Sequence, residues 1–510
     1  MRHLFLIPAI AFGAALAPLS AAMAQQAPDA AAPAATKPLA DSFLGRFVDN
    51  YRDHLNYTGE GSEPLKTRDQ PTPLDSPPFP GVNYSFGGSP VIGVPDTISS
   101  ALTDTIWQSD SSLGKLMKDE GIHLYGWVEP GANWSSSHNK FRWNNQSGGN
   151  APASYAVYPN SVMLDQFALY AEKVPDSVQT DHVDWGFRLT GVYGTDYKYT
   201  FSHDIASSQY MKQGHMYGYD PVMAYGDIYV PFVAEGMNIR IGRYISIPDI
   251  EAQLAPNNYT YSHSLLYGVD PYTQTGIVTT TKLTKNWTVQ LELSGGNDIA
   301  TWDSREVKLT PAACVSWTSD SGNDNIYPCI NGWNGGDYKY NNIQHDVITW
   351  YHKFNAKWHM ATEAYYMDEK NVPNLNNPQV AATPLAYNAV GAGYPVGFGY
   401  CGATGNSTKQ TCFTKEYAMV NYLNYEIDPL NSISLRNEFY NDVNGQRMGV
   451  PTLYSSHLIG WQHWIGDAIT FRPELRFDRA YNNAAFNANS AGAATAHNQI
   501  MLAADTIFHF

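Results

Sequence analysis

Charged residues are scarce in this chain, and basic residues are scarcer than acidic ones. Only 15% of its 510 residues are Asp, Glu, Lys or Arg, against about 25% in an ordinary soluble domain. The 31 Lys and Arg face 47 Asp and Glu, which gives a net charge of −16. Proteins that bind nucleic acid or dock electrostatically on anionic lipid need a basic surface, so this balance argues against both partners.

Long apolar runs and the short motifs of common enzymes are also missing. Beyond the N-terminus, no segment offers the roughly 18 uninterrupted apolar residues of a membrane-spanning helix. We find no Gly-x-Ser-x-Gly, His-Glu-x-x-His or phosphate-binding loop. His263 lies between Ser262 and Ser264, but neighbours on a strand point to opposite faces, which favours loop-fixing hydrogen bonds over a nucleophile and its base. We therefore predict no enzymatic activity, no cofactor and no metal, with an outer-membrane hydrolase as the weaker alternative.

Cysteine is rare as well, with four residues and no Cys-x-x-Cys spacing. An even number of cysteines in an exported chain favours disulfides over zinc or redox chemistry. Each pair is close in sequence, which predicts the bonds Cys314–Cys329 and Cys401–Cys412. We expect both in external loops.

The N-terminus indicates export. A basic start at Arg2 and His3 precedes a short apolar run, and Ala22-Met23-Ala24 fits a cleavage site before Gln25. We predict a signal peptide over residues 1–24, since the run is too short for a membrane anchor. Residues 25–95 are rich in Pro and Ala and are expected to be largely disordered, with one short helix near residues 39–55. Residues 96–120 have apolar positions at helical spacing and predict an amphipathic helix, either periplasmic or plugging a lumen.

From Gly121 onward the pattern indicates strands, and residues 121–510 are predicted to form one transmembrane antiparallel up-and-down β-barrel. About fourteen strands are expected, within a range of 12 to 16. Short connections alternate with long ones, which run near 135–161, 198–221, 247–271, 297–343, 369–413, 443–452 and 481–497. Short turns on one side and long loops on the other are typical of outer-membrane barrels.

Apolar and polar residues alternate along the clearest strands. In the segment 469–478, Leu475 and Phe477 alternate with Arg476 and Asp478. In a large barrel the apolar face meets lipid and the polar face lines the lumen. We expect opposite charges across the lumen to create a transverse field, and structural ion pairs within the wall are the alternative. The predicted lumen residues are Arg188, Asp227, Arg240, Glu292, Glu363, Arg436, Glu438, Arg472, Glu474, Arg476, Asp478 and Asp505.

Aromatic residues and the end of the chain fit the same picture. The chain has 35 Tyr and 13 Trp, and those near strand ends predict interfacial girdles. The predicted girdle residues are Tyr193, Tyr225, Tyr229, Trp287, Trp350, Trp358, Tyr365, Tyr366, Trp461 and Trp464.

The last twelve residues alternate with period two and end at Phe508-His509-Phe510. This strand is similar to the terminal strands of outer-membrane barrels. Phe508 and Phe510 are therefore predicted to be the signal that the barrel-assembly machinery reads, as a transient partner.

A further stretch carries a family resemblance. Gly242-Arg243, Tyr261-Ser262-His263-Ser264 and the segment Pro271-Tyr272-Thr273-Gln274-Thr275-Gly276 resemble the OmpL-like beta-barrel porin family of Gram-negative bacteria. The resemblance covers most of the chain after residue 121. It implies an outer-membrane channel that passes small hydrophilic solutes by diffusion, surrounded by outer-membrane lipid and without catalytic residues. A surface binding protein or adhesin acting through loops 297–343 and 369–413 is the alternative. Solute and oligomeric state stay open.

Overall fold

The computed structural model describes residues 42–58, 67–68, 91–142, 148–200, 202, 206, 208–211, 213–299, 307–333, 343–382, 401 and 407–510. The predicted signal peptide, residues 1–24, lies outside this description, as does most of the Pro- and Ala-rich segment 25–95. In the part of the chain that is described, no helix is both long and apolar enough to span a membrane.

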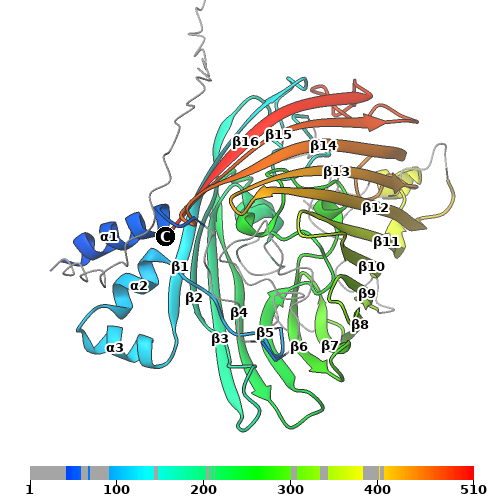
Figure 1. Ribbon diagram of the computed structural model, residues 1–510. Coiled ribbons are helices and arrows are strands. Elements are labelled where there is room, and N and C mark those ends of the chain that lie inside the picture. Colours follow the sequence, from blue (N-terminus) through cyan, green and yellow to red (C-terminus); the bar gives the residue numbers. More distant parts are fainter. Residues whose placement is uncertain are drawn as a thin grey trace, which may run out of the picture.

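The described residues form a closed barrel of sixteen antiparallel strands, in which each strand pairs with its neighbours in sequence and β1 pairs with β16 (Figure 1). The strands are β1 (His123–Ser135), β2 (Val162–Lys173), β3 (Asp184–Gly194), β4 (Gly218–Val230), β5 (Met237–Ile245), β6 (Thr273–Lys282), β7 (Trp287–Asn297), β8 (Thr310–Thr318), β9 (Asp324–Asn331), β10 (Gln344–Lys353), β11 (Trp358–Pro373), β12 (Thr411–Asp428), β13 (Asn431–Asp442), β14 (Thr452–Ile465), β15 (Ile469–Ala480) and β16 (Asn498–His509).

The barrel has two strands more than the fourteen expected. β8 and β9 lie within residues 297–343, which we had assigned to one long loop. Each contains a proline, Pro311 in β8 and Pro328 in β9, and a proline inside a run normally argues against a strand. The alternation of connections still holds, because β8 and β9 are joined by the short segment 319–323.

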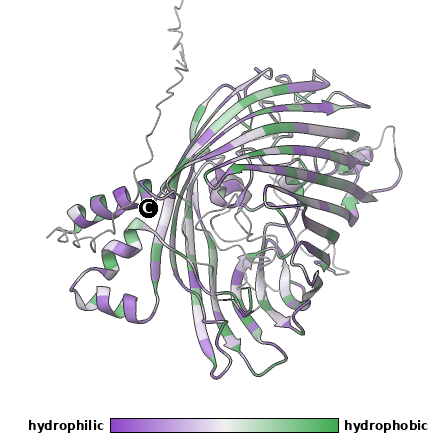
Figure 2. Cartoon of the chain, viewed as in Figure 1, coloured by the Kyte–Doolittle hydropathy of each residue, from purple (hydrophilic) through white to green (hydrophobic). Residues whose placement is uncertain are grey.

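The strands turn their apolar residues outward and their charges inward. On β15, Leu475 is 49% exposed, whereas Arg476 and Asp478 are both 0% exposed. A soluble protein buries the opposite set of side chains. Figure 2 shows the alternation of hydrophobic and hydrophilic residues along the strands. This wall therefore suits an exterior of lipid and a polar interior.

The aromatic prediction is only partly right. Five of the ten predicted girdle residues are exposed on the outer face, namely Tyr193, Trp287, Trp350, Trp358 and Trp461. Four are buried and belong to the inner face: Tyr225, Tyr229, Tyr365 and Trp464. Tyr366 is partly exposed. Because the side-chain period of a strand is two, an error of one residue moves a side chain to the other face.

The seam between the first and last strands closes at the chain terminus. The Phe510 N–H donates to the Gly126 carbonyl at 2.9 Å, and the Gly126 N–H donates to the Phe510 carbonyl at 3.0 Å. The Phe510 ring lies 6.1 Å from that of Phe167 on β2. Phe508 instead points outward and is 39% exposed. The two predicted signal residues thus lie at the seam, where Phe508 is exposed on the outer face and Phe510 packs against Phe167, which is itself 40% exposed.

Three helices precede the barrel: α1 (Phe43–Leu55), α2 (Ala101–Trp107) and α3 (Ser112–Asp119). The single helix expected over residues 96–120 is divided into α2 and α3, because the Ser111 hydroxyl accepts from the Gly114 N–H and caps a new helix. All three lie outside the barrel beside the start of β1 (Figure 1). The lumen plug that we left open for this segment is therefore not observed.

Hydrogen bonds fix these helices to one end of the barrel. The Thr103 hydroxyl donates to the Leu124 carbonyl at 2.8 Å and accepts from the Leu124 N–H at 3.0 Å. On α1, the His54 imidazole lies 2.8 Å from the Asp467 carboxylate in the turn between β14 and β15. Its other nitrogen lies 3.1 Å from the Asp104 carboxylate of α2.

Candidate functional site: the lumen and its inward loop

The connection between β5 and β6 folds into the barrel instead of extending outward. We call residues 246–272 the inward loop. All of them except Asp249 are buried, although a surface loop is normally exposed. It includes two short 3-10 helices, η4 (Ala255–Asn257) and η5 (Tyr267–Val269), and green coils are visible inside the barrel in Figure 1.

Three wall glutamates hold the backbone of the inward loop. Glu363 of β11 accepts from the Ile250 N–H at 2.8 Å. Glu438 of β13 accepts from the Leu266 N–H at 2.6 Å. Glu474 of β15 accepts from the Ser262 N–H at 3.0 Å. These strands lie on the far side of the ring from β5 and β6, so the loop crosses the lumen. Hydrogen bonds to ionised groups are stronger than hydrogen bonds between neutral groups.

Three wall arginines bind carbonyl groups of the same loop. Arg472 donates to the Ala255 carbonyl at 2.7 Å and to the Asn258 carbonyl at 3.1 Å. Arg476 donates to the His263 carbonyl at 2.8 Å, and Arg436 donates to the Ser262 carbonyl. Buried backbone groups need such partners. Six of the twelve predicted lumen residues therefore contact the inward loop directly.

Other predicted lumen charges form ion pairs between neighbouring strands. Arg240 of β5 lies 2.9 Å from Asp227 of β4, and the two are direct partners in the strand ladder. The same holds for Arg472 and Asp505 on β15 and β16. The expected transverse field is wrong for these pairs, because opposite charges adjoin within one wall and largely cancel. Structural ion pairs, the alternative we stated, describe them.

Two further ion pairs involve predicted lumen residues. Arg188 of β3 lies 2.6 Å from its ladder partner Glu172. Arg476 lies 2.7 Å from Asp478 on the same strand. Glu292 is buried on β7 at 5% exposure. All of these charges belong to the inner wall.

His263 has a structural role in the inward loop. Its Nε2 lies 2.8 Å from the Ala252 carbonyl, and its ring stacks on Tyr155 with centroids 3.7 Å apart. Burial lowers the pKa of His263 to about 4. The Ser264 hydroxyl accepts from the Tyr267 N–H, and it forms no hydrogen bond to the imidazole among those of the described residues. The loop-fixing interpretation therefore fits better than a nucleophile and base.

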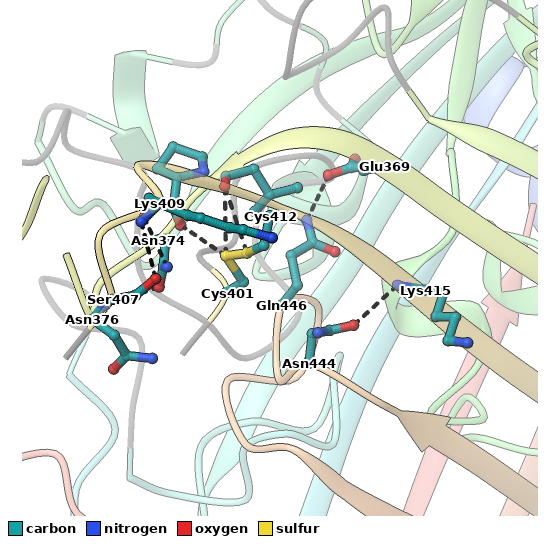
Figure 3. Close-up of a disulfide and its surroundings, with 12 residues drawn as sticks. Glu369, Asn374, Asn376, Cys401, Ser407, Lys409, Cys412, Lys415, Asn444 and Gln446 are labelled. Carbon is teal, nitrogen blue, oxygen red and sulfur yellow. Dashed lines mark hydrogen bonds between the residues drawn. A yellow bond between two sulfur atoms is a disulfide. The ribbon is translucent and has the colours of Figure 1, made fainter. Parts of the chain in front are cut away.

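Both predicted disulfides are present, but the first is not in an external loop. Cys314 and Cys329 are direct partners on β8 and β9, with their Cα atoms 4.1 Å apart. Cys401 is bonded to Cys412, which is the second residue of β12. The Cα atoms of the two cysteines are 6.5 Å apart. Figure 3 shows this second bond beside Asn374, where the long connection between β11 and β12 begins.

The inward fold of residues 246–272 was the feature that our sequence analysis missed. It treated this segment as one of several long external loops. A signal was present, since Ile250, Leu254, Leu265 and Leu266 are apolar residues in a connection expected to face water. All four are at most 8% exposed.

Comparisons with known proteins place this geometry in context. A family model described as "Putative beta-barrel porin-2, OmpL-like" matches residues 121–510. The crystal structure of the outer membrane channel DcaP of Acinetobacter baumannii is 12% identical, with a TM-score of 0.44, and the match covers 76% of this chain and 97% of that one. An anion-selective porin from Comamonas acidovorans is 10% identical, with a TM-score of 0.44 and coverage of 76% and 99%. Curated proteins yield no match.

Proposed function

Because this chain belongs to the OmpL-like beta-barrel porin-2 family, we propose that it is an outer-membrane channel for small hydrophilic solutes whose path is set by the inward loop. The observation that supports this most strongly is the anchoring of that loop. Glutamates and arginines from β11, β13 and β15 hold it across a polar lumen. A barrel wall needs no such internal loop for stability in lipid, but a constricted pore needs a fixed one.

The same proposal states what surrounds the barrel and how the barrel is exported and assembled. The apolar outer face contacts outer-membrane lipid, with exposed Trp287, Trp350 and Trp461 at an interface. Residues 1–24 are removed after export. The strand that ends at Phe510 is read by the barrel-assembly machinery during insertion, and it then pairs with Gly126 to close the seam.

The lumen charge gives the channel a preference for cations. Carboxylates near the inward loop that form no ion pair with a basic side chain, among the described residues, include Asp249, Asp270, Glu363 and Glu416. Acidic groups in a lumen lower the barrier for cations and raise it for anions. The wall arginines are already paired or bound to the loop, so they offset this field only partly.

Single-channel conductance of refolded residues 25–510 in a planar bilayer tests the proposal. We expect stepwise conductance. In a salt gradient, we expect a reversal potential whose sign indicates selectivity for cations. Silence from a barrel that is folded by its heat-modifiable migration would rule out the channel. Binding of a ligand or surface that depends on the connections between β7 and β8 and between β11 and β12 would then favour the surface binding protein.

A further inference from the structure

Three carboxylates converge where the inward loop meets β11. Asp249 and Asp270 come from the two ends of the loop, and Glu363 comes from the strand. Each offers one carboxylate oxygen, and these oxygens all lie within 4.8 Å of one another. Asp270 is 0% exposed and Glu363 is 1% exposed. The fold has thus placed up to three like charges together in a covered part of the lumen.

The oxygens of this cluster lack hydrogen-bond donors. Among the described residues, neither oxygen of Asp249 or Asp270 has a partner, and the Glu363 Oε1 has none either. The other Glu363 oxygen accepts from the Ile250 N–H, which fixes the direction of its side chain. Buried carboxylates without a partner are costly, because neither water nor a positive charge compensates for the lost solvation.

Two neighbouring side chains define the cluster further. The Tyr267 hydroxyl is buried, has no hydrogen-bond partner among the described residues, and interacts electrostatically with both Asp249 and Asp270. Arg447 acts on Asp270, but its guanidinium lies 3.7 Å from Glu369 and donates to the Val269 carbonyl. This arginine is therefore shared and leaves the three carboxylates undercompensated.

We propose that Asp249, Asp270 and Glu363 bind a calcium ion, which ties both ends of the inward loop to β11. All the donors are oxygens, which hard cations prefer. Calcium binds oxygen at about 2.3–2.6 Å, so two ligands on opposite sides of it stand up to ~5 Å apart. Magnesium, at about 2.0–2.1 Å, spans only ~4 Å. The three oxygens lie within 4.8 Å of one another, which is inside the span that calcium bridges.

The remaining ligands and the charge balance agree with this site. Calcium takes about 6–8 oxygen ligands, so water molecules that enter with the ion supply the ligands that the three carboxylates leave open. The three carboxylates, each with an oxygen within 4.8 Å of the others, repel one another when they are ionised. A divalent cation relieves that repulsion. Our sequence-based expectation of no metal considered ligands close in sequence, whereas these three meet only in the folded barrel.

Calcium titration of the folded barrel tests the site without requiring conductance. Residues 25–510, refolded in detergent and freed of metal with a chelator, are titrated with Ca²⁺ and with Mg²⁺ in a calorimeter. We expect one Ca²⁺ per chain and weaker binding of Mg²⁺. Absence of saturable Ca²⁺ binding to a folded, heat-modifiable barrel would overturn the proposal. Tighter binding of Mg²⁺ than of Ca²⁺ would overturn it too.

Variants show whether the ion binds at these residues. D270N and E363Q are each expected to lower the Ca²⁺ affinity at least tenfold. E251Q is the matched control: Glu251 is a buried carboxylate of the same loop, but it already accepts from the Ser264 N–H and the Tyr422 hydroxyl. The E251Q substitution should change the Ca²⁺ affinity only a few-fold. Unchanged affinity in both D270N and E363Q would place the ion elsewhere and refute the site.

Thermal stability gives a second readout that a purely structural role would not produce. In chelator, D270N should unfold at the same temperature as the unmodified protein or higher, because it removes one of three repelling charges. In Ca²⁺ the order should reverse, since only the unmodified protein gains binding free energy. If D270N is less stable by the same amount in both conditions, Asp270 supports the fold and does not bind calcium.

Discussion

The Glu438 carboxylate accepts a hydrogen bond from the Leu266 N–H at 2.6 Å, and this contact joins β13 to the inward loop across the lumen. Glu474 makes the equivalent contact with the Ser262 N–H. A glutamine accepts a hydrogen bond less strongly than a carboxylate. We expect the double variant E438Q/E474Q to loosen the loop, so that single-channel conductance rises about twofold or its noise increases. The measurement is a planar-bilayer recording.

E416Q is the control for this experiment. Glu416 lies on β12, next to the anchor strand β13, is 0% exposed, and has no hydrogen-bond partner among the described residues. The E416Q substitution removes a lumen charge and leaves the contacts of the inward loop unchanged. If E416Q changes conductance and noise as much as the double variant does, the effect comes from charge alone and the anchoring explanation fails.

Helix α1 should dock on the barrel in a pH-dependent manner. Burial alone lowers the pKa of His54, but hydrogen bonds and charge from Asp104 and Asp467 outweigh it and raise the pKa to about 9. Because the folded pKa is above the ordinary value of about 6.5, this stabilisation is complete below pH ~6.5 and is lost as pH rises through about 9.

Limited proteolysis measures this effect. We expect trypsin to cleave at Arg52 about tenfold more slowly in the unmodified protein than in H54Q at pH 7, which corresponds to about 1.4 kcal/mol. At pH 10 the two rates should converge. Taking the ratio of the two proteins at each pH removes the pH dependence of the protease itself. A constant ratio from pH 7 to pH 10 would contradict the role of His54.

The disulfide between β8 and β9 should stabilise the barrel measurably. It closes a segment with a sequence separation of 15 residues, for which the loss of chain entropy is about 3 kcal/mol. Replacing both Cys314 and Cys329 by Ser should lower the free energy of unfolding by about 2–3 kcal/mol. Urea unfolding followed by heat-modifiable migration measures it, and an unchanged midpoint would show that strand pairing alone holds the two strands.

Removal of residues 25–119 should leave conductance unchanged. The helices α1, α2 and α3 lie outside the barrel in Figure 1, and their hydrogen bonds described above join them to the start of β1 and to the turn between β14 and β15. The truncated barrel should therefore show the same unit conductance and the same reversal potential as residues 25–510. A larger conductance after truncation would mean that part of this segment enters the lumen.

Much of the barrel could be predicted from sequence because strand patterning is local. Alternation such as that of Leu475 and Phe477 with Arg476 and Asp478 identifies both the strand and its lipid face. The pairs Cys314–Cys329 and Cys401–Cys412 followed from proximity in the chain. β8 was missed because Pro311 weakened the local pattern on which that reasoning depends.

The site was harder to predict because its contacts are not local. Glu438 and Leu266 are 172 residues apart in sequence. No local sequence pattern indicates a contact between residues so far apart. Arg240 is 1% exposed, and its pairing with Asp227 depends on the register of β4 and β5. That register decides whether a charged side chain pairs with a neighbour on the wall or faces an opposite charge across the lumen.

The pairing of β1 with β16 constrains the order of events in biogenesis. Trp127 lies opposite His509 in this pair, so the first strand of the barrel completes its pairing only when the last strand is in place. A partial barrel has two open edges, whose peptide groups find no hydrogen-bond partners in lipid. Insertion strand by strand is therefore unfavourable for this chain. The edge peptide groups of a partial barrel therefore need water or another protein as partners until β16 pairs with β1.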